Sequence, residues 1–384
     1  MKDDKSINLN TRDIKASATE SRIIKTTLRH VPPNESKFAV LELSTKAVKL
    51  LIGKDVEAIR RNVDSIGPEP TDAKFDFGNF FRTSDKVDVG KWLNAQNVMN
   101  VGYFSTRVLG SILQKKALMI EHGVDTVYTI ATAAYRTAAN REEILDIIRE
   151  HAKINVRILS KEEEAVATLF AYRFTSAYRL QLRKSHVVMI DQGGGSTEVS
   201  VFTDTKLVGN PYSINLGTTA LYNYLFRDSR PGTPVEQALK NSDRKVKERL
   251  VSFYKNMDET MSTGGNVFCV AVGTAITQAV GKVGNAKQHD KILTREFISE
   301  RIAKAEETIL ERVHTIGELD EAIRKNALND AYDNALTARL GLPMFVEIMD
   351  KYKIPELHVS GTGLWYGIYF QRLYNYPALE DDED

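Results

Sequence analysis

Two stretches of the chain place short apolar runs on either side of a small polar or glycine loop. In 187–202, an apolar run rich in β-branched residues ends at Asp191, meets three glycines and is followed by a second β-prone run. This pattern is typical of two buried strands joined in a hairpin. Residues 38–53 repeat the layout in weaker form, with Glu42 at the end of the first run. One such hairpin near the start of each half predicts a duplicated architecture of two α/β domains.

The rest of the pattern predicts alternating short strands and helices. Four further apolar runs indicate strands, at 126–130, 156–159, 267–272 and 357–360. Helical periodicity or amphipathic character covers 91–122, 144–151, 237–261, 297–315 and 317–349. Asn140 with Glu143, and Ser160 with Glu163, predict capping boxes at two helix starts. Residues 64–90 are expected to be rich in loops because of their glycine and prolines.

Several turns carry residues suited to anions and metal ions. Three strands deliver small and hydroxyl-bearing residues to a helix start, at 131–137, 273–277 and 360–363. The glycines after Asp191 allow several backbone N–H groups to converge on one anion. Asp191 and Glu198, at the two ends of that loop, offer oxygen ligands to a hard divalent cation. An ordinary hairpin whose glycines serve only the turn leaves these two acids unexplained, so we expect a polyanionic substrate between two domains.

Composition narrows the class of protein. A chain of 384 residues has room for two or three domains at ~150 residues each. Its net charge of +1 gives no global attraction to nucleic acid or a membrane. The single cysteine excludes an internal disulfide framework, and no apolar signal core or membrane-length apolar run occurs. We therefore expect a cytoplasmic protein that binds neither DNA nor a membrane, and the sequence leaves open whether it forms a homodimer.

Taken together, the motifs resemble those of one family. They are Asp191-Gln-Gly-Gly-Gly-Ser-Thr-Glu198, 131–140, Glu163-Glu164-Ala165, Gly273-Thr274 and 359–364. In this order, over roughly residues 37–370, they look like the exopolyphosphatase / guanosine pentaphosphate phosphohydrolase (Ppx/GppA) family, in its short two-domain form. The resemblance implies release of terminal phosphate from inorganic polyphosphate or pppGpp with Mg²⁺ or Mn²⁺. The expected partners are polyphosphate or guanosine penta/tetraphosphate.

The resemblance also implies a fold and its domains. The fold is α/β and of the actin-like ATPase type shared by sugar kinases, Hsp70 and actin, with two ribonuclease-H-like domains around a cleft. The first domain is expected to comprise 37–168 plus 364–377, and the second 169–363. Residues 1–36 are expected to form a mobile extension or short edge element, and 378–384 an acidic tail.

Roles follow from the resemblance residue by residue. Glu164, which lies just past the second capping box, corresponds to the catalytic carboxylate that activates water. Asp191 corresponds to a metal ligand, with Glu198 and Glu42 as further acids of the metal site. The remaining site residues are expected to bind phosphate: Thr45, Lys46, Arg136, Gly193, Gly194, Gly195, Ser196, Gly273 and Thr274.

The first hairpin departs from the family pattern. The family reads Asp-x-Gly-Ser-Asn-Ser followed by Arg, whereas this chain has Glu42-Leu-Ser-Thr-Lys-Ala47 followed by Lys49, which cannot make a bidentate fork. Lys161 and Val166 replace the usual Gly and Arg around the Glu-Glu pair. Three functions stay open: a phosphohydrolase, a catalytically weak or inactive regulatory protein that binds polyphosphate or (p)ppGpp, and an actin-like ATPase or sugar kinase. The Glu-Glu-Ala placement is not a kinase feature.

Overall fold

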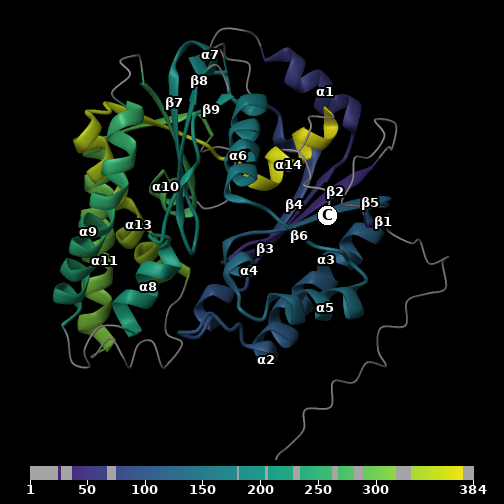
Figure 1. The fold of residues 1–384 in the computed structure, drawn as a ribbon, viewed down its shortest axis with the longest axis horizontal. Coiled ribbons are helices and arrows are strands. Elements are labelled where there is room, and N and C mark those ends of the chain that lie inside the picture. The colour runs from purple at the N-terminus through teal and green to yellow at the C-terminus, as the bar shows by residue number, and fades with distance from the viewer. Residues whose placement is uncertain are drawn as a thin grey trace, which may run out of the picture.

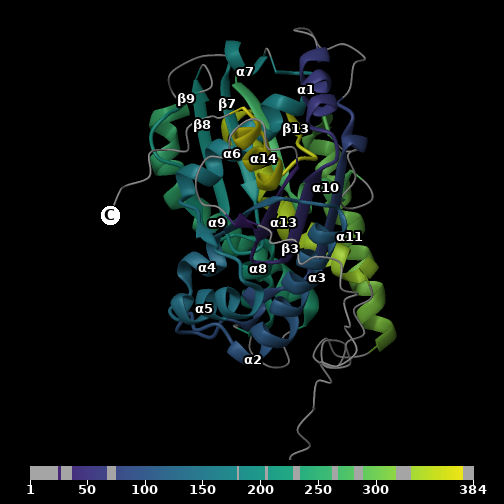
Figure 2. The same ribbon diagram turned by 90° about the vertical axis from the view of Figure 1, so that its right-hand side faces the viewer.

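Two mixed β-sheets, each with its own helices, form the molecule (Figures 1 and 2). The structure is a computed structural model that describes residues 25–26, 37–66, 75–179, 181–203, 206–227, 234–261, 267–280, 289–316 and 330–374. None of the helices in these ranges is both long and apolar enough to span a membrane.

The first sheet has the strand order β4-β3-β2-β5, with β1 and β6 both paired to β5. Its strands are β1 (Lys25–Thr26), β2 (Phe38–Leu43), β3 (Ala47–Gly53), β4 (Phe80–Lys86), β5 (Thr126–Ala131) and β6 (Arg157–Ile158). The β2, β3 and β4 strands are antiparallel, whereas β5 is parallel to β2. Every residue of β2 and β5 is buried, which explains their nearly continuous apolar pattern.

The second sheet repeats this topology, in the order β10-β8-β7-β11-β13-β12, with β9 paired to β8. Its strands are β7 (His186–Gln192), β8 (Thr197–Thr203), β9 (Lys206–Leu207), β10 (Tyr212–Ile214), β11 (Val267–Gly273), β12 (Lys291–Thr294) and β13 (Glu356–Val359). Again three antiparallel strands are followed by parallel ones. The duplicated α/β architecture predicted from the two hairpins is therefore confirmed.

Helices pack on both faces of each sheet, on the outer faces and on the faces that look toward the other sheet (Figure 1). Those of the first half are α1 (Val56–Ser65), α2 (Val101–Tyr103), α3 (Leu109–Glu121), α4 (Ala133–Thr137) and α5 (Arg141–Ala152), with a π-helical turn at Phe104–Val108 and 3₁₀ turns at Phe77–Asn79 and Val89–Trp92. Those of the second are α7 (Gln181–Lys184), α8 (Thr218–Arg227), α9 (Val235–Met261), α10 (Thr274–Ala279), α11 (Arg295–Ile316) and α13 (Asp330–Tyr352).

Two helices lie side by side between the sheets: α6 (Lys161–Thr175) and α14 (Leu364–Leu373), drawn teal and yellow in Figure 1. Their backbones approach closely, because a Cβ added at Gly367 would lie 1.7 Å from the carbonyl oxygen of Ala167. One face of α6 packs on the second sheet, and the other packs with α14 on the first. The domain boundary that we expect at 168/169 therefore falls inside a helix shared by both domains.

Some local predictions are confirmed and others are wrong. Ser160 caps α6 in the expected capping box. Asn140 occupies the N-cap of α5, but its side chain bonds the backbone of Met99 instead of capping the helix. The region 64–90 contains β4, an edge strand whose partly exposed polar residues hide the strand pattern. Of residues 1–36 only the edge strand β1 is described, and the acidic tail lies outside the described residues.

Candidate active site

Two neighbouring acids at the start of α6, Glu163 and Glu164, have different partners. The Ser160 hydroxyl accepts from the N–H of Glu163 (3.2 Å), and the Glu163 carboxylate accepts from the N–H of Ser160 (2.8 Å) and from Arg157 (2.5 Å). Glu163 is thus fully used by the helix cap. Glu164, one residue further, turns to a different neighbour and forms an ion pair with Arg136 of α4.

Glu164 lies in a largely buried, acidic environment. Burial raises the pKa of Glu164 to about 8, and the nearby carboxylates Glu198 and Asp191 act in the same direction against the opposing guanidinium of Arg136. Arg136 is fixed in turn because its Nη1 also donates to the carbonyl of Leu159 (2.6 Å). A buried carboxylate whose pKa lies near neutrality is suited to accept and release a proton.

The second hairpin supplies two acids that face each other. Asp191 and Glu198 are directly opposite in the β7–β8 ladder. Asp191 Oδ2 accepts from the Thr168 hydroxyl (3.1 Å), and Glu198 Oε1 accepts from the hydroxyls of Ser196 (2.6 Å) and Ser213 (3.0 Å). Burial raises the pKa of Asp191 to about 7, with Glu198 as the next cause, and burial also raises the pKa of Glu198. Two buried like charges at this spacing favour a bound cation or a proton.

The first hairpin contributes a buried ion pair. Glu42 and Lys49 are cross-strand neighbours in β2 and β3, and Lys49 Nζ lies 2.7 Å from Glu42 Oε1. The side chain of Glu42 is only 3% exposed, and its second oxygen has no hydrogen-bond partner among the described residues. Both charges act on the pKa of Asp191, which Lys49 lowers and Glu42 raises, so the two hairpins share one electrostatic site.

The glycine loop is held from behind by the start of α8. Carbonyl oxygens of Gly193 and Gly194 accept from the N–H groups of Thr218 (3.1 Å) and Thr219 (2.7 Å). Within the described part of the chain, no backbone hydrogen bond uses the N–H groups of Gly194 or Gly195. Because the carbonyls are taken and the N–H groups are not, this loop can offer donors to an anion.

The tips of the two hairpins meet across the cleft. A Cβ added at Gly195 would lie 3.3 Å from the Thr45 hydroxyl, and one added at Gly194 would lie 3.4 Å from Lys46 Cβ. Thr45 thus lies against the glycine loop. The ammonium of Lys46 points elsewhere, because it donates to the hydroxyl of Thr337 in α13 (3.0 Å).

Lys46 belongs to a small pocket between the two halves. The pocket is lined by Lys46, Asp88, Lys91, Thr218, Thr219, Tyr222, Leu336, Thr337 and Leu340. A second lysine crosses the cleft here, since Lys91 Nζ lies 4.2 Å from the centre of the Tyr222 ring. Both lysines of the first half thereby contact helices of the second.

The Gly273–Thr274 turn has a clear packing role. Gly273 has φ 114°, and a Cβ there would lie 2.1 Å from the carbonyl oxygen of Gln192. Only glycine fits such a position, so this residue is required by the fold whether or not it binds phosphate. Gly273 pairs with Gln192 in the β7–β11 ladder, which places the turn beside the base of the glycine loop.

The acids fit a hard divalent cation by their chemistry. Glu42, Asp191 and Glu198 offer carboxylate oxygens, and Glu42 has an oxygen without a partner. In the described ranges no three His, Cys, Asp or Glu side chains converge as a ready-made metal cage. Mg²⁺ does not need one, because it binds through one or two carboxylates together with waters and substrate phosphates.

Two polar contacts of the site escaped the sequence reasoning. Thr168 lies four residues after Glu164 on the same face of α6, so helical spacing alone can identify it. Ser213 bonds Glu198 because the two are register partners in β10 and β8, which the sequence does not reveal.

Comparison with known proteins places the chain in a family. The chain is 28% identical over 144 residues to an uncharacterised protein of Streptomyces coelicolor, and this match spans 38% of the chain and 41% of the relative. The Aquifex aeolicus member of the Ppx/GppA family has a similar structure (TM-score 0.60, 20% identity, 88% of this chain and 98% of that chain). So does an exopolyphosphatase from Cytophaga hutchinsonii (TM-score 0.65, 16% identity, 89% and 99%). These structures share its fold, and because residues 71–375 match the Ppx/GppA phosphatase family, the chain belongs to that family.

Proposed function

We propose that this protein hydrolyses a terminal phosphoanhydride bond of inorganic polyphosphate or pppGpp with the help of Mg²⁺. One observation carries the proposal: Glu164, Arg136 and Asp191 converge at the base of the glycine loop, where a phosphoryl group and a water molecule would meet. Family membership and the fold shared with the Cytophaga hutchinsonii exopolyphosphatase support the substrate class.

The residues divide the work of phosphoryl transfer, which depends on positioning and charge neutralisation. Glu164 accepts the proton of the attacking water, for which its raised pKa suits it. Arg136 holds the Glu164 carboxylate and offers its remaining N–H groups to phosphoryl oxygens. Backbone N–H groups of the glycine loop and the hydroxyl of Thr45 bind the other oxygens. Mg²⁺, held by Asp191 with Glu198 or Glu42, supplies positive charge to the phosphate oxygens when bound.

A second candidate is a regulatory protein that binds polyphosphate or (p)ppGpp and cleaves it slowly or not at all. The first hairpin favours it, because Lys49 is committed to Glu42 and Lys46 to Thr337. A lysine also gives phosphate a point charge without the fixed geometry of a glycine loop. Positioning of the scissile phosphate is then poor while binding persists.

Phosphate release from polyphosphate, pppGpp and ATP, each measured with and without Mg²⁺, tests the proposal. We expect Mg²⁺-dependent release from one of the first two substrates. Tight binding without release favours the regulatory protein, and release from ATP alone contradicts both candidates. Restoring the family residues with Ser44→Gly and Lys46→Asn should raise kcat if poor positioning limits turnover.

A further inference from the structure

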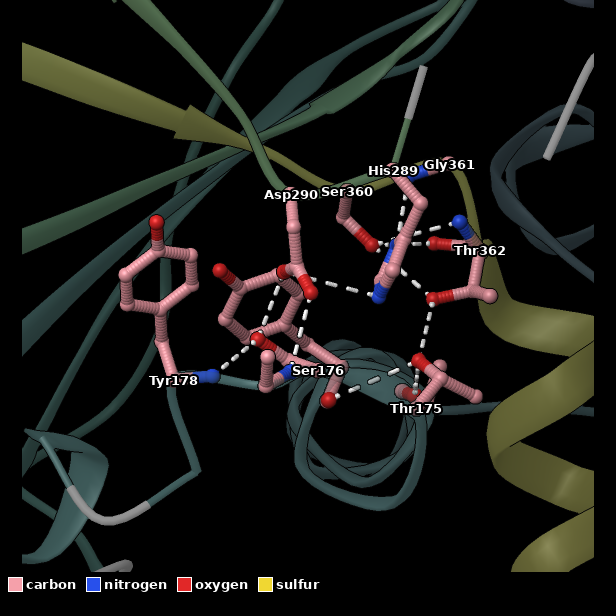
Figure 3. Close-up of polar contacts among 11 residues, drawn as sticks. Thr175, Ser176, Tyr178, His289, Asp290, Ser360, Gly361 and Thr362 are labelled. Carbon is pink, nitrogen blue, oxygen red and sulfur yellow. Dashed lines mark hydrogen bonds and ion pairs between the residues drawn. The ribbon is translucent and has the colours of Figure 1, made fainter. Parts of the chain in front are cut away.

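A buried polar cluster lies where the chain crosses between the two sheets, away from the acids described above (Figure 3). One crossing leaves the end of α6 at Ser176, and the other runs through 360–363 from β13 to α14. Two consecutive residues, His289 and Asp290, lie directly before β12 and contact both crossings. We call them the crossover turn.

Asp290 holds the end of α6. Its Oδ1 accepts from the Ser176 hydroxyl (2.6 Å), and its Oδ2 accepts from the N–H of Ala177 (2.9 Å). Ser176 is fully buried. A negative charge at a helix C-terminus opposes the helix dipole, so electrostatics alone does not favour an acid here. What the carboxylate provides is two strong charge-assisted hydrogen bonds that fix the direction in which the chain leaves α6.

His289 holds the second crossing. Its Nδ1 accepts from the N–H of Gly361 (3.0 Å), and its ring packs against Tyr172 of α6 and Phe77 of the first half, with centroid distances of 5.4 and 5.7 Å. Burial lowers the pKa of His289, so the ring stays neutral and Nδ1 remains an acceptor. A Cβ added at Gly361 would lie 3.1 Å from Cβ of His289, so a larger residue there requires His289 to shift slightly.

Small hydroxyl residues complete the cluster and join the two crossings directly. Thr175, the last residue of α6, lies 3.4 Å from the Thr362 hydroxyl, and Ser360 donates to the Thr362 carbonyl (2.8 Å). These three residues are at most 1% exposed. A change in the turn that removes a partner therefore leaves a buried polar group unsatisfied, and a shift of the attached helices would relieve this cost.

The other end of α6 carries Glu164. From Ser176 back to Glu164 the helix extends about 18 Å at 1.5 Å per residue. A tilt of about 3° at the clamped end therefore moves Glu164 by about 1 Å, and such a misplacement can cost about 10²-fold in rate. Asp191 and Glu198 belong to the β7–β8 hairpin of the second sheet, so a tilt of α6 changes how Glu164 lies against them.

We propose that Asp290 is a positioning residue that, with His289, sets the orientation of α6 and thereby places Glu164 against the acids of the second sheet. The inference rests on the proposed hydrolase function. In this role the crossover turn affects kcat, although neither of its residues contacts the substrate.

The test compares Asp290→Asn with the parent enzyme in steady-state phosphate release. The amide nitrogen of asparagine cannot accept, so one of the two donors from α6 loses its partner. We expect kcat to fall about tenfold to hundredfold while KM stays within about twofold. Asp350→Asn is the matched control, because Asp350 pairs with Arg295 (2.5 Å) on the exposed surface of the same half and should leave both constants unchanged.

A distance measurement tests the positioning role of Asp290 even if the protein shows no enzyme activity. Spin labels at Lys161→Cys, at the exposed start of α6, and Val251→Cys on α9 report how α6 lies on the second half. Asp290→Asn should shift or broaden this distance, and Asp350→Asn should not. An unchanged distance, or an unchanged kcat in folded Asp290→Asn, overturns the positioning role. If the parent enzyme releases no phosphate from any substrate, the proposed function fails, and the distance alone decides the inference.

Discussion

Replacing Glu164 by glutamine tests the chemistry most directly. Glutamine keeps the shape of the side chain and an oxygen that accepts from Arg136, but it cannot take a proton from water. Loss of a catalytic base costs about 10²–10⁴-fold in rate. We therefore expect kcat for phosphate release to fall by this factor while the affinity for polyphosphate or pppGpp is retained.

The same substitution has a pH-dependent effect on stability. Burial raises the pKa of Glu164 from 4.5 to about 8, so between these values the folded, ligand-free protein binds a proton that the unfolded chain has released. In this window the free energy of unfolding of the parent falls as the pH rises. Glutamine does not titrate, so the free energy of unfolding of the variant does not fall with pH for this reason. At 1.36 kcal/mol per pKa unit, the variant gains roughly 2–3 kcal/mol over the parent between pH 5 and pH 7.

Two assays check this reasoning, with Glu163→Gln as the matched control. Phosphate release gives kcat and KM, and thermal unfolding at pH 5, 6 and 7 without divalent cations gives the stability difference. Glu163→Gln keeps a side chain able to complete the capping box, so its turnover should stay within about threefold of the parent. Full turnover in Glu164→Gln, or a stability difference that does not grow with pH, would refute the assignment of Glu164.

The geometry also predicts the outcome of two further substitutions and of one chemical modification. Asp191→Asn should raise the Mg²⁺ concentration for half-maximal turnover at least about tenfold, and an unchanged Mg²⁺ titration would contradict a metal role. Gly217→Ala should destabilise the fold by about 1–3 kcal/mol, because its Cβ would lie 2.3 Å from the Gly194 carbonyl oxygen. The control is Gly110→Ala, whose Cβ would have no neighbour within 4 Å, so its melting temperature should not fall. Cys269, with its thiol pKa raised to about 12 by burial, should react with thiol reagents only after unfolding, which a time course in urea measures.

The sequence predicted most of the fold because hairpins and buried strands leave a local pattern. The apolar runs at 38–53 and 187–202 predicted β2–β3 and β7–β8, whose residues are buried almost throughout. β4 was missed because an edge strand needs no apolar alternation. The packing of α6 between both sheets is a tertiary property, and a domain boundary drawn along the chain cannot represent it.

The candidate site was predictable where chemistry is local and unpredictable where partners come from distant segments. The capping box predicts that Glu163 completes the helix cap and that Glu164, one residue later, has no part in it. In the structure the two acids pair with different arginines. The motif predicts that Lys46 binds phosphate, and it gives no sign that the ammonium also donates to Thr337, 291 residues away in the sequence. A lysine has a long stem, and its loop position does not determine where its charge lies.

The three acids of this site are unfavourable for stability where they are buried, and the proposed ligands explain why the fold retains them. Glu164, Asp191 and Glu198 are all buried and all have raised pKa values, so each resists ionisation in the absence of a ligand. A structural core would gain stability by replacing such groups with apolar residues. A site that receives a cation and a phosphate chain gains instead from acids that are held in place and short of positive charge. In the proposed reaction, bound Mg²⁺ and phosphate would offset this cost in stability, because they bind only the folded protein.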